Sequence, residues 1–212
     1  MPEAQWRLGL RCGGEEKMER MEQQFDFCRE IDKEKLIQRQ NYLTNGERKE
    51  NDAEHAWHMS VMAVILSEYA NEEIDVLKVV TMILIHDIVE IDAGDTYAYD
   101  EEGKATQRER ELKAADRLFG ILPEDQRKKF RGLWNEFEAA ETPEAKFART
   151  LDHIQPLMLN AASEGRSWRE HDIHLAQVLA RNEKTAEGSE KIWDYVLQNL
   201  IRPSVEKGNL KE

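Results

Sequence analysis

The sequence predicts an all-α protein with a single domain. Leu, Glu, Ala and Arg are common among the 212 residues, whereas 5 Pro and 11 Gly are sparse, and this composition favours helices. Apolar residues recur at helical spacing, and no segment shows the convincing alternation of apolar and polar residues that is typical of a strand. No repeat and no linker rich in Pro, Gly or Ser divides the chain, and its length suits one ordinary core.

Turns, caps and apolar faces place the helices along the chain. The segment Thr44-Asn45-Gly46 is a turn signal after the first helix, and Asp52 is suited to cap the second. The third helix is apolar over most of its circumference, which indicates a central, buried element. Pro123 and Pro143 suit the first turns of two later helices. Helices are therefore expected over about 20–43, 52–69, 72–91, 105–119 and 123–140, from 143 onward, and over about 172–182 and 185–205.

Both ends of the chain are expected outside the domain. The first residues show no clear period, so residues 1–20 are predicted to be a disordered leader, 21–205 the domain and 206–212 a tail. The first helix would supply Phe25 and Leu36, among others, to the core. The N-terminus lacks the apolar stretch of a secretion signal, and no segment is long enough to span a membrane.

Charge and cysteine usage narrow the function. The net charge of -13 argues against polymeric nucleic acid as a partner, because such binders carry basic patches. Cys12 and Cys28 have neither the spacing of metal ligands nor that of a disulfide framework, so reduced thiols and a cytoplasmic location are expected.

Three separated segments carry candidate metal ligands. His86-Asp87 ends an apolar run, and burying such ionisable groups is costly unless they are paired or bound to a metal. His55 lies upstream in an acidic setting, and Asp152 lies in another apolar helix. Two imidazoles with two carboxylates favour cobalt, manganese, iron, nickel or zinc over magnesium, which prefers oxygen ligands. The four side chains predict one divalent transition-metal site suited to metal-assisted hydrolysis.

Two further acids suit the same chemistry. Glu90 follows His86 by four residues and projects from the same helical face, so it can reach a water at the metal as a general acid or base. Asp95 comes just past the helix end and could contact a substrate hydroxyl or the leaving group.

The remaining histidines have more ordinary interpretations. His58, one turn after His55, could be a ligand but more often would support one. His153 points about 100° away from Asp152 and is expected at the surface or behind a ligand. A second pair, His171-Asp172, follows a polar stretch, which favours a helix N-terminus with Asp172 as its cap or first-turn acid.

The ligand pattern resembles the HD-domain metal-dependent phosphohydrolases. The segments 48–55 and 86–95 are similar to the branch that contains the bacterial 5'-deoxynucleotidases and their eukaryotic HD-domain relatives, and the resemblance covers roughly residues 25–165. It implies an all-helical HD fold, a homodimer and one divalent ion held by His55, His86, Asp87 and Asp152. It also implies removal of the 5'-phosphate from deoxyribonucleoside monophosphates.

The resemblance also implies roles around the metal. Glu90 would position or activate the attacking water, Asp95 would assist at the substrate, and an arginine before the first His would hold the phosphate. Arg39 matches that arginine best and Arg48 second, and a guanidinium suits phosphate because its donors form a planar fork. The aromatic residue that follows this arginine in deoxynucleotidases, and that disfavours ribose there, is replaced by Gln40, so the sequence does not predict a preference for deoxyribose over ribose.

Two other functions stay open at this stage. The protein could hydrolyse a larger nucleotide or a signalling nucleotide, although only Arg39, Arg48 and Lys49 supply positive charge nearby in the sequence. It could also be a non-enzymatic helical dimer that binds a metal or a nucleotide. Glu90 argues against the second reading, because a binding site has no use for a base directed at water.

Overall fold

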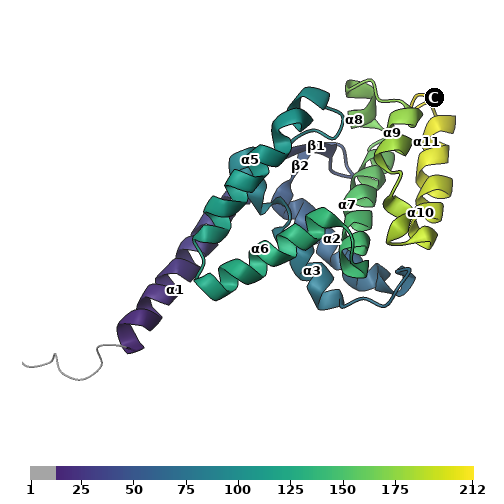
Figure 1. Ribbon diagram of the computed structural model, residues 1–212. Helices are drawn as coiled ribbons and strands as arrows, with labels where there is room; N and C mark the ends of the chain where they lie inside the picture. Colours follow the sequence, from purple (N-terminus) through teal and green to yellow (C-terminus); the bar gives the residue numbers. More distant parts are fainter. Residues whose placement is uncertain (1–12) are drawn as a thin grey trace, which may run out of the picture.

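The computed structural model describes residues 13–212, and most of them are helical (Figure 1). Within this range the all-α class is confirmed, apart from one short hairpin. The elements in chain order are α1 (Gly13–Glu30), η1 (Ile31–Leu36), β1 (Gln38–Tyr42), β2 (Lys49–Asn51), α2 (Asp52–Leu66), η2 (Ser67–Tyr69), α3 (Val76–Ile85), η3 (Asp87–Val89), α4 (Glu90–Ala93), α5 (Glu101–Gly120), α6 (Glu124–Ala139), α7 (Pro143–Ala162), α8 (Arg166–Glu170), α9 (Leu175–Arg181), η4 (Thr185–Glu187), α10 (Glu190–Val196), η5 (Leu197–Ile201) and α11 (Arg202–Glu206).

The N-terminal region differs from its prediction. The helix expected over 20–43 ends at Glu30, and residues 38–42 pair instead with residues 49–51 as an antiparallel hairpin. The hairpin turns at Gly46, whose φ of 70° favours glycine, while the Asn45 side chain accepts a hydrogen bond from the backbone of Glu47. This turn and packing on α7 and α8 set the strand, because Gln38–Tyr42 carries no apolar alternation.

The ends of the chain also differ from expectation. Residues 13–20, expected in a disordered leader, form the first turns of α1, and residues 1–12 lie outside the described residues. Phe25 and Leu36, expected in the core, are exposed. Residues 207–212 pack back on the domain, since Leu210 is buried and the Lys211 carbonyl accepts from Leu175 N.

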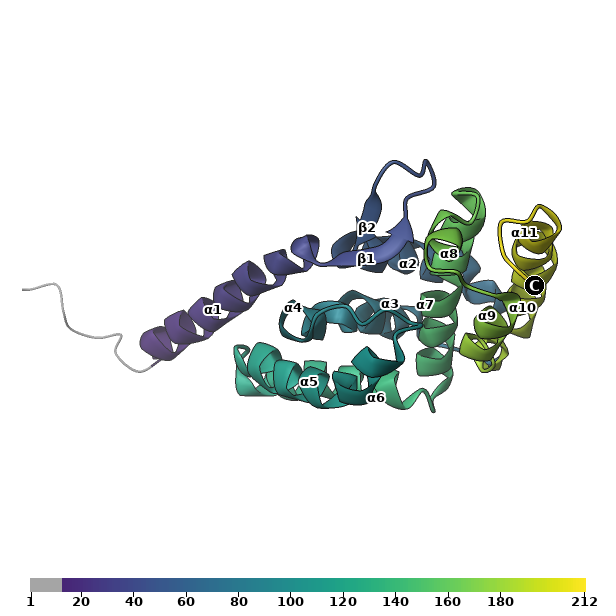
Figure 2. The ribbon, with the colours of Figure 1, turned by 90° about the horizontal axis from the view of Figure 1, so that it is seen from above.

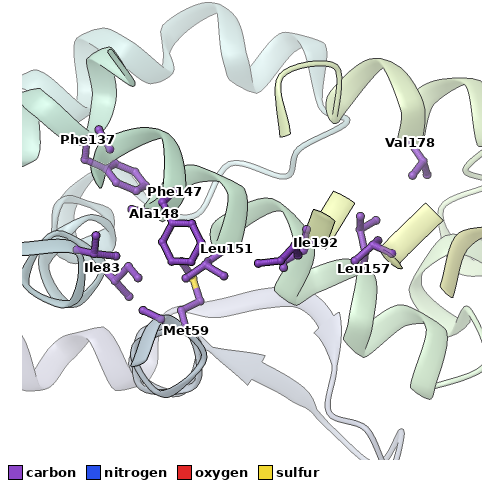
Figure 3. Packing of buried hydrophobic residues seen from close by; sticks show 14 of the residues in the cluster. Met59, Ile83, Phe137, Phe147, Ala148, Leu151, Leu157, Val178 and Ile192 are labelled. Carbon is purple, nitrogen blue, oxygen red and sulfur yellow. The ribbon is translucent and has the colours of Figure 1, made fainter. Parts of the chain in front are cut away.

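Helices α2, α3 and α7 form the centre of the domain. Asn51 begins α2 through a capping box with Glu54, so the N-cap is one residue before the expected Asp52. Asp75 begins α3 by accepting from the backbone of Leu77 and Lys78. The three helices enclose one hydrophobic cluster, which α10 and the C-terminus extend (Figure 3). Its largest members include Met59, Met82, Ile83, Phe147, Leu151 and Trp168.

Helices α5 and α6 cover a second side of the centre. Seen from above, α3 and α4 lie between these two helices and the side formed by α2 and the hairpin (Figure 2). Phe119 and Trp134 meet there in a second cluster. Pro123 is the N-cap of α6 rather than its first residue, whereas Pro143 lies in the first turn of α7, as expected. Across the described residues, no helix combines the length and the apolar composition needed to cross a membrane.

Candidate metal centre and pocket

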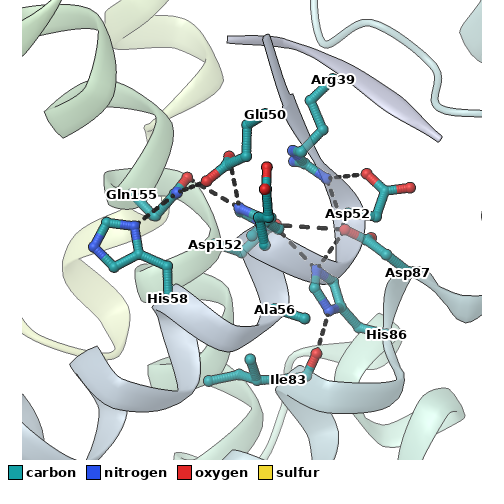
Figure 4. Close-up of polar contacts among 12 residues, drawn as sticks. Arg39, Glu50, Asp52, Ala56, His58, Ile83, His86, Asp87, Asp152 and Gln155 are labelled. Atoms are coloured by element: carbon teal, nitrogen blue, oxygen red, sulfur yellow. Dashed lines mark hydrogen bonds and ion pairs between the residues drawn. The ribbon is translucent and has the colours of Figure 1, made fainter. Parts of the chain in front are cut away.

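The His86-Asp87 pair lies where the apolar helix α3 ends inside the domain. The helix expected to run unbroken over 72–91 is divided there into α3, η3 and α4. His86 Nδ1 donates to the carbonyl of Ile83 at 2.7 Å, which is one of the free carbonyls at the end of α3 (Figure 4). Trp134 Nε1 donates to the His86 carbonyl at 3.2 Å. The first bond orients the ring and the second holds the backbone of His86, so that Nε2 faces the carboxylates of Asp87 and Asp152.

His55 is oriented in the same way by a residue of α7. It lies on α2, is fully buried, and donates through Nδ1 to Gln155 Oε1 at 2.9 Å. Gln155 in turn donates to Glu50 Oε1 at 2.7 Å, and this bond fixes which end of its amide faces His55. Because Nδ1 carries the proton, Nε2 of His55 is also the unprotonated nitrogen. Asp152 lies three residues before Gln155 and therefore faces the same centre.

The four predicted ligands converge at distances that suit one ion. His55 Nε2 lies 3.3 Å from Asp152 Oδ1 and 4.0 Å from Asp87 Oδ2. His86 Nε2 lies 3.1 Å from Asp87 Oδ2 and 3.7 Å from Asp152 Oδ1. Ligand atoms that each lie about 2.0–2.2 Å from a metal are roughly 3–4 Å from one another. Since His86 Nε2 is buried and has no hydrogen-bond partner among residues 13–212, the residues fit a divalent cation.

The charges of the ligands show the same need for a cation. Burial opposes a charged His86, yet the carboxylates of Asp87 and Asp152 hold the pKa of its imidazole well above the usual value. Burial likewise opposes a charged Asp87, but His86 and Arg39 keep the pKa of its carboxyl well below the usual range. Two buried carboxylates thus require positive charge, which a proton or a metal ion can supply.

Glu90 and Arg39 stand beside the ligands. Arg39 Nη1 donates to Asp87 Oδ2 at 2.7 Å and to Asp52 Oδ1 at 3.2 Å. Carboxylate oxygens of Asp52, Asp87 and Glu90 lie within 4.8 Å of one another, and Glu90 Oε2 is buried with no hydrogen-bond partner in the part of the chain that the structure describes. Burial and the neighbouring Asp87 and Asp52 raise the pKa of Glu90 well above its usual value. Burial raises the pKa of Asp52 to about 7.

One pocket of about 400 Å³ opens onto these groups. It is lined by Arg39, His86, Asp87, Glu90, Asp95 and Asp152, with Tyr97, Tyr99 and Trp168 farther along its wall. Asp95 is half-buried, and its burial raises the pKa of its carboxyl. Arg48 is not brought to this pocket: it is exposed and pairs with Glu54 at 2.5 Å.

Several residues of the site were not predicted from the sequence. Gln155 and Glu50 orient His55, and only the i+3 spacing of Gln155 from Asp152 could have indicated the first. Lys104, Arg108, Arg149 and Arg181 also line the pocket, so its positive charge is larger than the residues near Arg39 in sequence suggest. In the structure, Arg149 lies 3.9 Å from Glu138 and over the ring of Phe137.

The other histidines are now placed. His58 Nδ1 lies 3.2 Å from Gln155 Nε2, so it supports the residue that orients His55. His153 is half-buried in the pocket wall rather than at the surface, with Nδ1 2.9 Å from Thr185 Oγ1. Burial lowers the pKa of His153 to about 3. His174, not Asp172, is the N-cap of α9, and Asp172 lies in the preceding turn.

Comparison with known proteins gives relatives that are named 5'-deoxynucleotidases. The chain is 32% identical to human 5'-deoxynucleotidase HDDC2 over 139 residues, which are 65% of this chain and 66% of the human protein. The mouse protein of the same name is 31% identical over 139 residues, covering 65% and 67% of the two chains. The match thus spans just under two thirds of the human relative.

A solved structure matches nearly the whole fold. It is that of a predicted metal-dependent phosphohydrolase from Magnetospirillum magnetotacticum, 46% identical, with a TM-score of 0.88, covering 92% of this chain and 98% of that one. The HD domain family matches residues 31–193, which include all four converging ligands. The fold is a helical bundle, and two imidazoles and two carboxylates converge at its centre. Together with this family match, these features show that the chain belongs to the HD domain family.

Proposed function

We propose that this protein is a metal-dependent phosphohydrolase that removes the 5'-phosphate from ribo- and deoxyribonucleoside monophosphates. The observation that carries the proposal is the convergence of His55, His86, Asp87 and Asp152 beside Glu90, at one end of a pocket of about 400 Å³. The names of the human and mouse relatives support the substrate class, and that of the bacterial structure supports the metal dependence.

The four ligands would hold one divalent transition metal, with cobalt, manganese, iron, nickel or zinc favoured over magnesium by the two imidazoles. Bound there, the ion would lower the pKa of a water and neutralise charge on the phosphate. Arg39 lines the pocket beside the ligands and would bind a phosphate oxygen through its guanidinium. The bond between phosphorus and the 5'-oxygen is the one that breaks.

Glu90 and Asp95 would move the two protons of the reaction. Glu90 lies in the pocket within reach of the ligands and would take the proton of the attacking water. Asp95 lies in the same wall, and its raised pKa suits a group that gives a proton to the leaving 5'-oxygen. The products are a nucleoside and inorganic phosphate.

A panel of phosphorylated metabolites tests the proposal. Purified protein should release phosphate from nucleoside monophosphates when cobalt or manganese is added and should stop when a chelator is added. Glu90→Gln should bind the cation in calorimetry yet lose activity by about 100-fold or more, whereas Glu109→Gln, which alters an exposed acid, should stay active. A flat panel with tight nucleotide binding would contradict hydrolysis and favour a binding protein.

The position after Arg39 bears on the sugar. Gln40 lines the pocket and accepts a hydrogen bond from Lys49 at 2.6 Å, so no aromatic ring stands there to exclude a 2'-hydroxyl. We expect AMP and dAMP to have kcat/KM values within about tenfold of each other. A preference for dAMP well beyond this would show that another group senses the 2' position.

Larger nucleotides form the second candidate. The basic residues Lys104, Arg108, Arg149 and Arg181 in the pocket wall favour it more than the sequence did. Two of them already face an acid, since Arg108 lies 3.1 Å from Glu138 and Arg149 lies 3.9 Å from it. Nucleoside di- and triphosphates in the same panel would reveal this activity.

A homodimer is the proposed assembly, and the cytoplasm the proposed location. The mutually packed helices α2 and α3 expose a row of large apolar side chains, which monomers rarely leave uncovered. The row consists of Trp57, Val61, Val64, Ile65, Leu77 and Leu84. The free thiol of Cys28 suits a reducing compartment. In light scattering, Trp57→Glu should yield monomers, while the control Tyr195→Glu, at an exposed residue of α10, should not.

A further inference from the structure

The pocket extends from the metal ligands along one face of α7. Asp152, His153, Pro156, Leu157 and Asn160 all line it, and this spacing places them on neighbouring turns. Asp152 and Asn160 are separated by about 12 Å along the helix axis. A nucleotide whose phosphate lies at Asp152 would therefore extend along this face, past His153 and toward Asn160.

A chain of hydrogen bonds fixes the proton of His153 on Nδ1. Asn182 Nδ2 donates to the Val178 carbonyl at 2.8 Å, so its Oδ1 is the acceptor for Thr185 Oγ1 at 3.1 Å. The hydroxyl of Thr185 has one hydrogen, and that hydrogen is used in this bond. Its oxygen must then accept from His153 Nδ1, which is 2.9 Å away. Nε2 of His153 is left as a bare acceptor.

Two buried acceptors in this wall lack partners. Within the described residues, neither His153 Nε2 nor Asn160 Oδ1 has a hydrogen-bond partner, and both atoms are buried. Leaving such acceptors unpaired costs free energy, so a ligand that brings N–H donors gains by pairing them. Tyr97, Tyr99 and Trp168 line the same part of the pocket and supply flat apolar surface for a ring.

We propose that the part of the pocket around His153 and Asn160 is a nucleobase subsite that selects bases with an exocyclic amino group. Adenine and cytosine carry such a group where hypoxanthine and uracil carry a carbonyl. The carbonyl oxygen would face the lone pair of His153 Nε2, whereas the amino group donates to it. The proposal rests on the proposed function for the nature of the substrate, and Thr185 acts in it as a positioning residue.

Matched substrate pairs test the subsite in the metal-loaded protein. We expect kcat/KM for dAMP to exceed that for dIMP by about tenfold or more, and the same order for dCMP over dUMP. Deoxyribose 5-phosphate, which has no base, provides the reference rate. Equal rates within both pairs would overturn the proposal.

Substitution of Thr185 separates the subsite from a merely structural role. Thr185→Val removes the acceptor of His153 Nδ1, so the imidazole can carry its proton on Nε2 instead, and the ratio of amino to carbonyl substrates should fall toward one. Thr185→Ser keeps the hydroxyl and should keep the ratio. If Thr185→Val does not fold, Asn160→Leu removes the other acceptor and should also lower the ratio. Unchanged ratios in the folded variants would contradict the proposal.

Binding of nucleosides keeps the two proposals distinguishable. Calorimetry of the protein with deoxyadenosine and deoxyinosine needs no hydrolysis, and deoxyadenosine should bind about tenfold more tightly. If no phosphate ester is hydrolysed but this preference is present, the proposed function fails and the subsite stands. Equal affinities, or binding of neither nucleoside, would overturn the subsite whether or not phosphate is released.

Discussion

The chain contains two His-Asp pairs with opposite fates. His86 and Asp87 are buried at the centre of the domain, 4% and 8% exposed, where they meet His55 and Asp152. His171 and Asp172 are exposed in the turn between α8 and α9, and Asp172 has a φ of 56° and pairs with Lys211.

The residues that precede each pair explain the difference. α3 is apolar and carries His86-Asp87 into the interior, where Val79, Met82 and Ile83 have no exposed surface. The second pair follows the short helix Arg166–Glu170, which keeps only Ser167 and Trp168 buried. Burying an acid and an imidazole costs free energy, so a buried pair needs partners or an ion, whereas an exposed pair is stabilised by water.

The largest expected effect separates the two aspartates. Asp87→Ala removes a ligand, so divalent cation binding should fall by well over about 100-fold and phosphate release should cease. Asp172→Ala should leave both unchanged, because its carboxylate is exposed and pairs with Lys211. Calorimetry with manganese measures the cation affinity of the two variants, and a phosphate-release assay measures their activity. Phosphate release by the Asp87→Ala protein would contradict the role of Asp87 as a metal ligand.

Two glutamines, one near each His-Asp pair, test whether the residues that support a histidine also matter for cation binding. Gln155→Met fills a similar volume but cannot accept strongly from His55 Nδ1, so cation affinity should fall by about 10–100-fold. Gln177→Met, near the second pair, removes only an acceptor for the backbone of His174 and should not change that affinity. Equal affinities in the two variants would show that His55 needs no help to face the ion.

The response to pH should come from the buried pair and the titratable groups around it, and not from the exposed pair. The pKa of His86 is held well above its usual value of 6.5, which favours a protonated imidazole in the metal-free protein. A cation must displace that proton, and its affinity should therefore fall as pH is lowered below the raised pKa. The proton also stabilises the metal-free fold, fully below pH 6.5 and less as pH rises through the raised pKa.

Two measurements check this sign. Calorimetry in two buffers of different ionisation enthalpy counts the protons released on binding, and thermal unfolding of the metal-free protein from pH 6.5 upward should show declining stability that added cation restores. His86→Gln should lower the number of protons released per bound cation, and His171→Ala should preserve it. An affinity that rises on acidification would contradict the expected sign.

The smallest expected effect concerns the indirect contact of the exposed pair with the pocket. The ring of His171 lies 4.6 Å from that of Tyr97, which lines the pocket. An aromatic pair contributes about 0.5–1.5 kcal/mol, so His171→Ala should raise KM for nucleotides by roughly 2–10-fold without changing cation affinity. Steady-state kinetics would measure the change in KM, and calorimetry would measure the cation affinity. A change in cation affinity would contradict the expectation that the exposed pair does not influence the metal site.

The sequence predicts the chemistry of the site better than its surroundings. His86, Asp87 and Asp152 stand out because ionisable residues interrupt apolar helices, and the four candidate ligands do converge. Gln155 is as fully buried as His55, but an amide in a helix has many uses and only its contacts reveal this one.

The hairpin and the basic residues of the pocket wall could not be predicted from the sequence. The residues Gln38–Tyr42 are polar throughout, so their strand depends on the turn at Gly46 and on packing against α7 and α8. Arg108, Arg149 and Arg181 come from separate helices, and nothing in their local sequence places them around one pocket. Both features follow from contacts between distant segments, which local patterns do not encode.

The bonds of His86 to the carbonyl of Ile83 and to Trp134 have a consequence for local opening of the fold. The imidazole cannot swing away unless its bond to the Ile83 carbonyl at the end of α3 breaks, and the backbone of His86 cannot move unless the buried indole of Trp134 loses its acceptor. Amide hydrogens around residues 83–87 should therefore exchange with solvent only as slowly as those of the deepest core. Inactivation on heating would then coincide with global melting instead of preceding it.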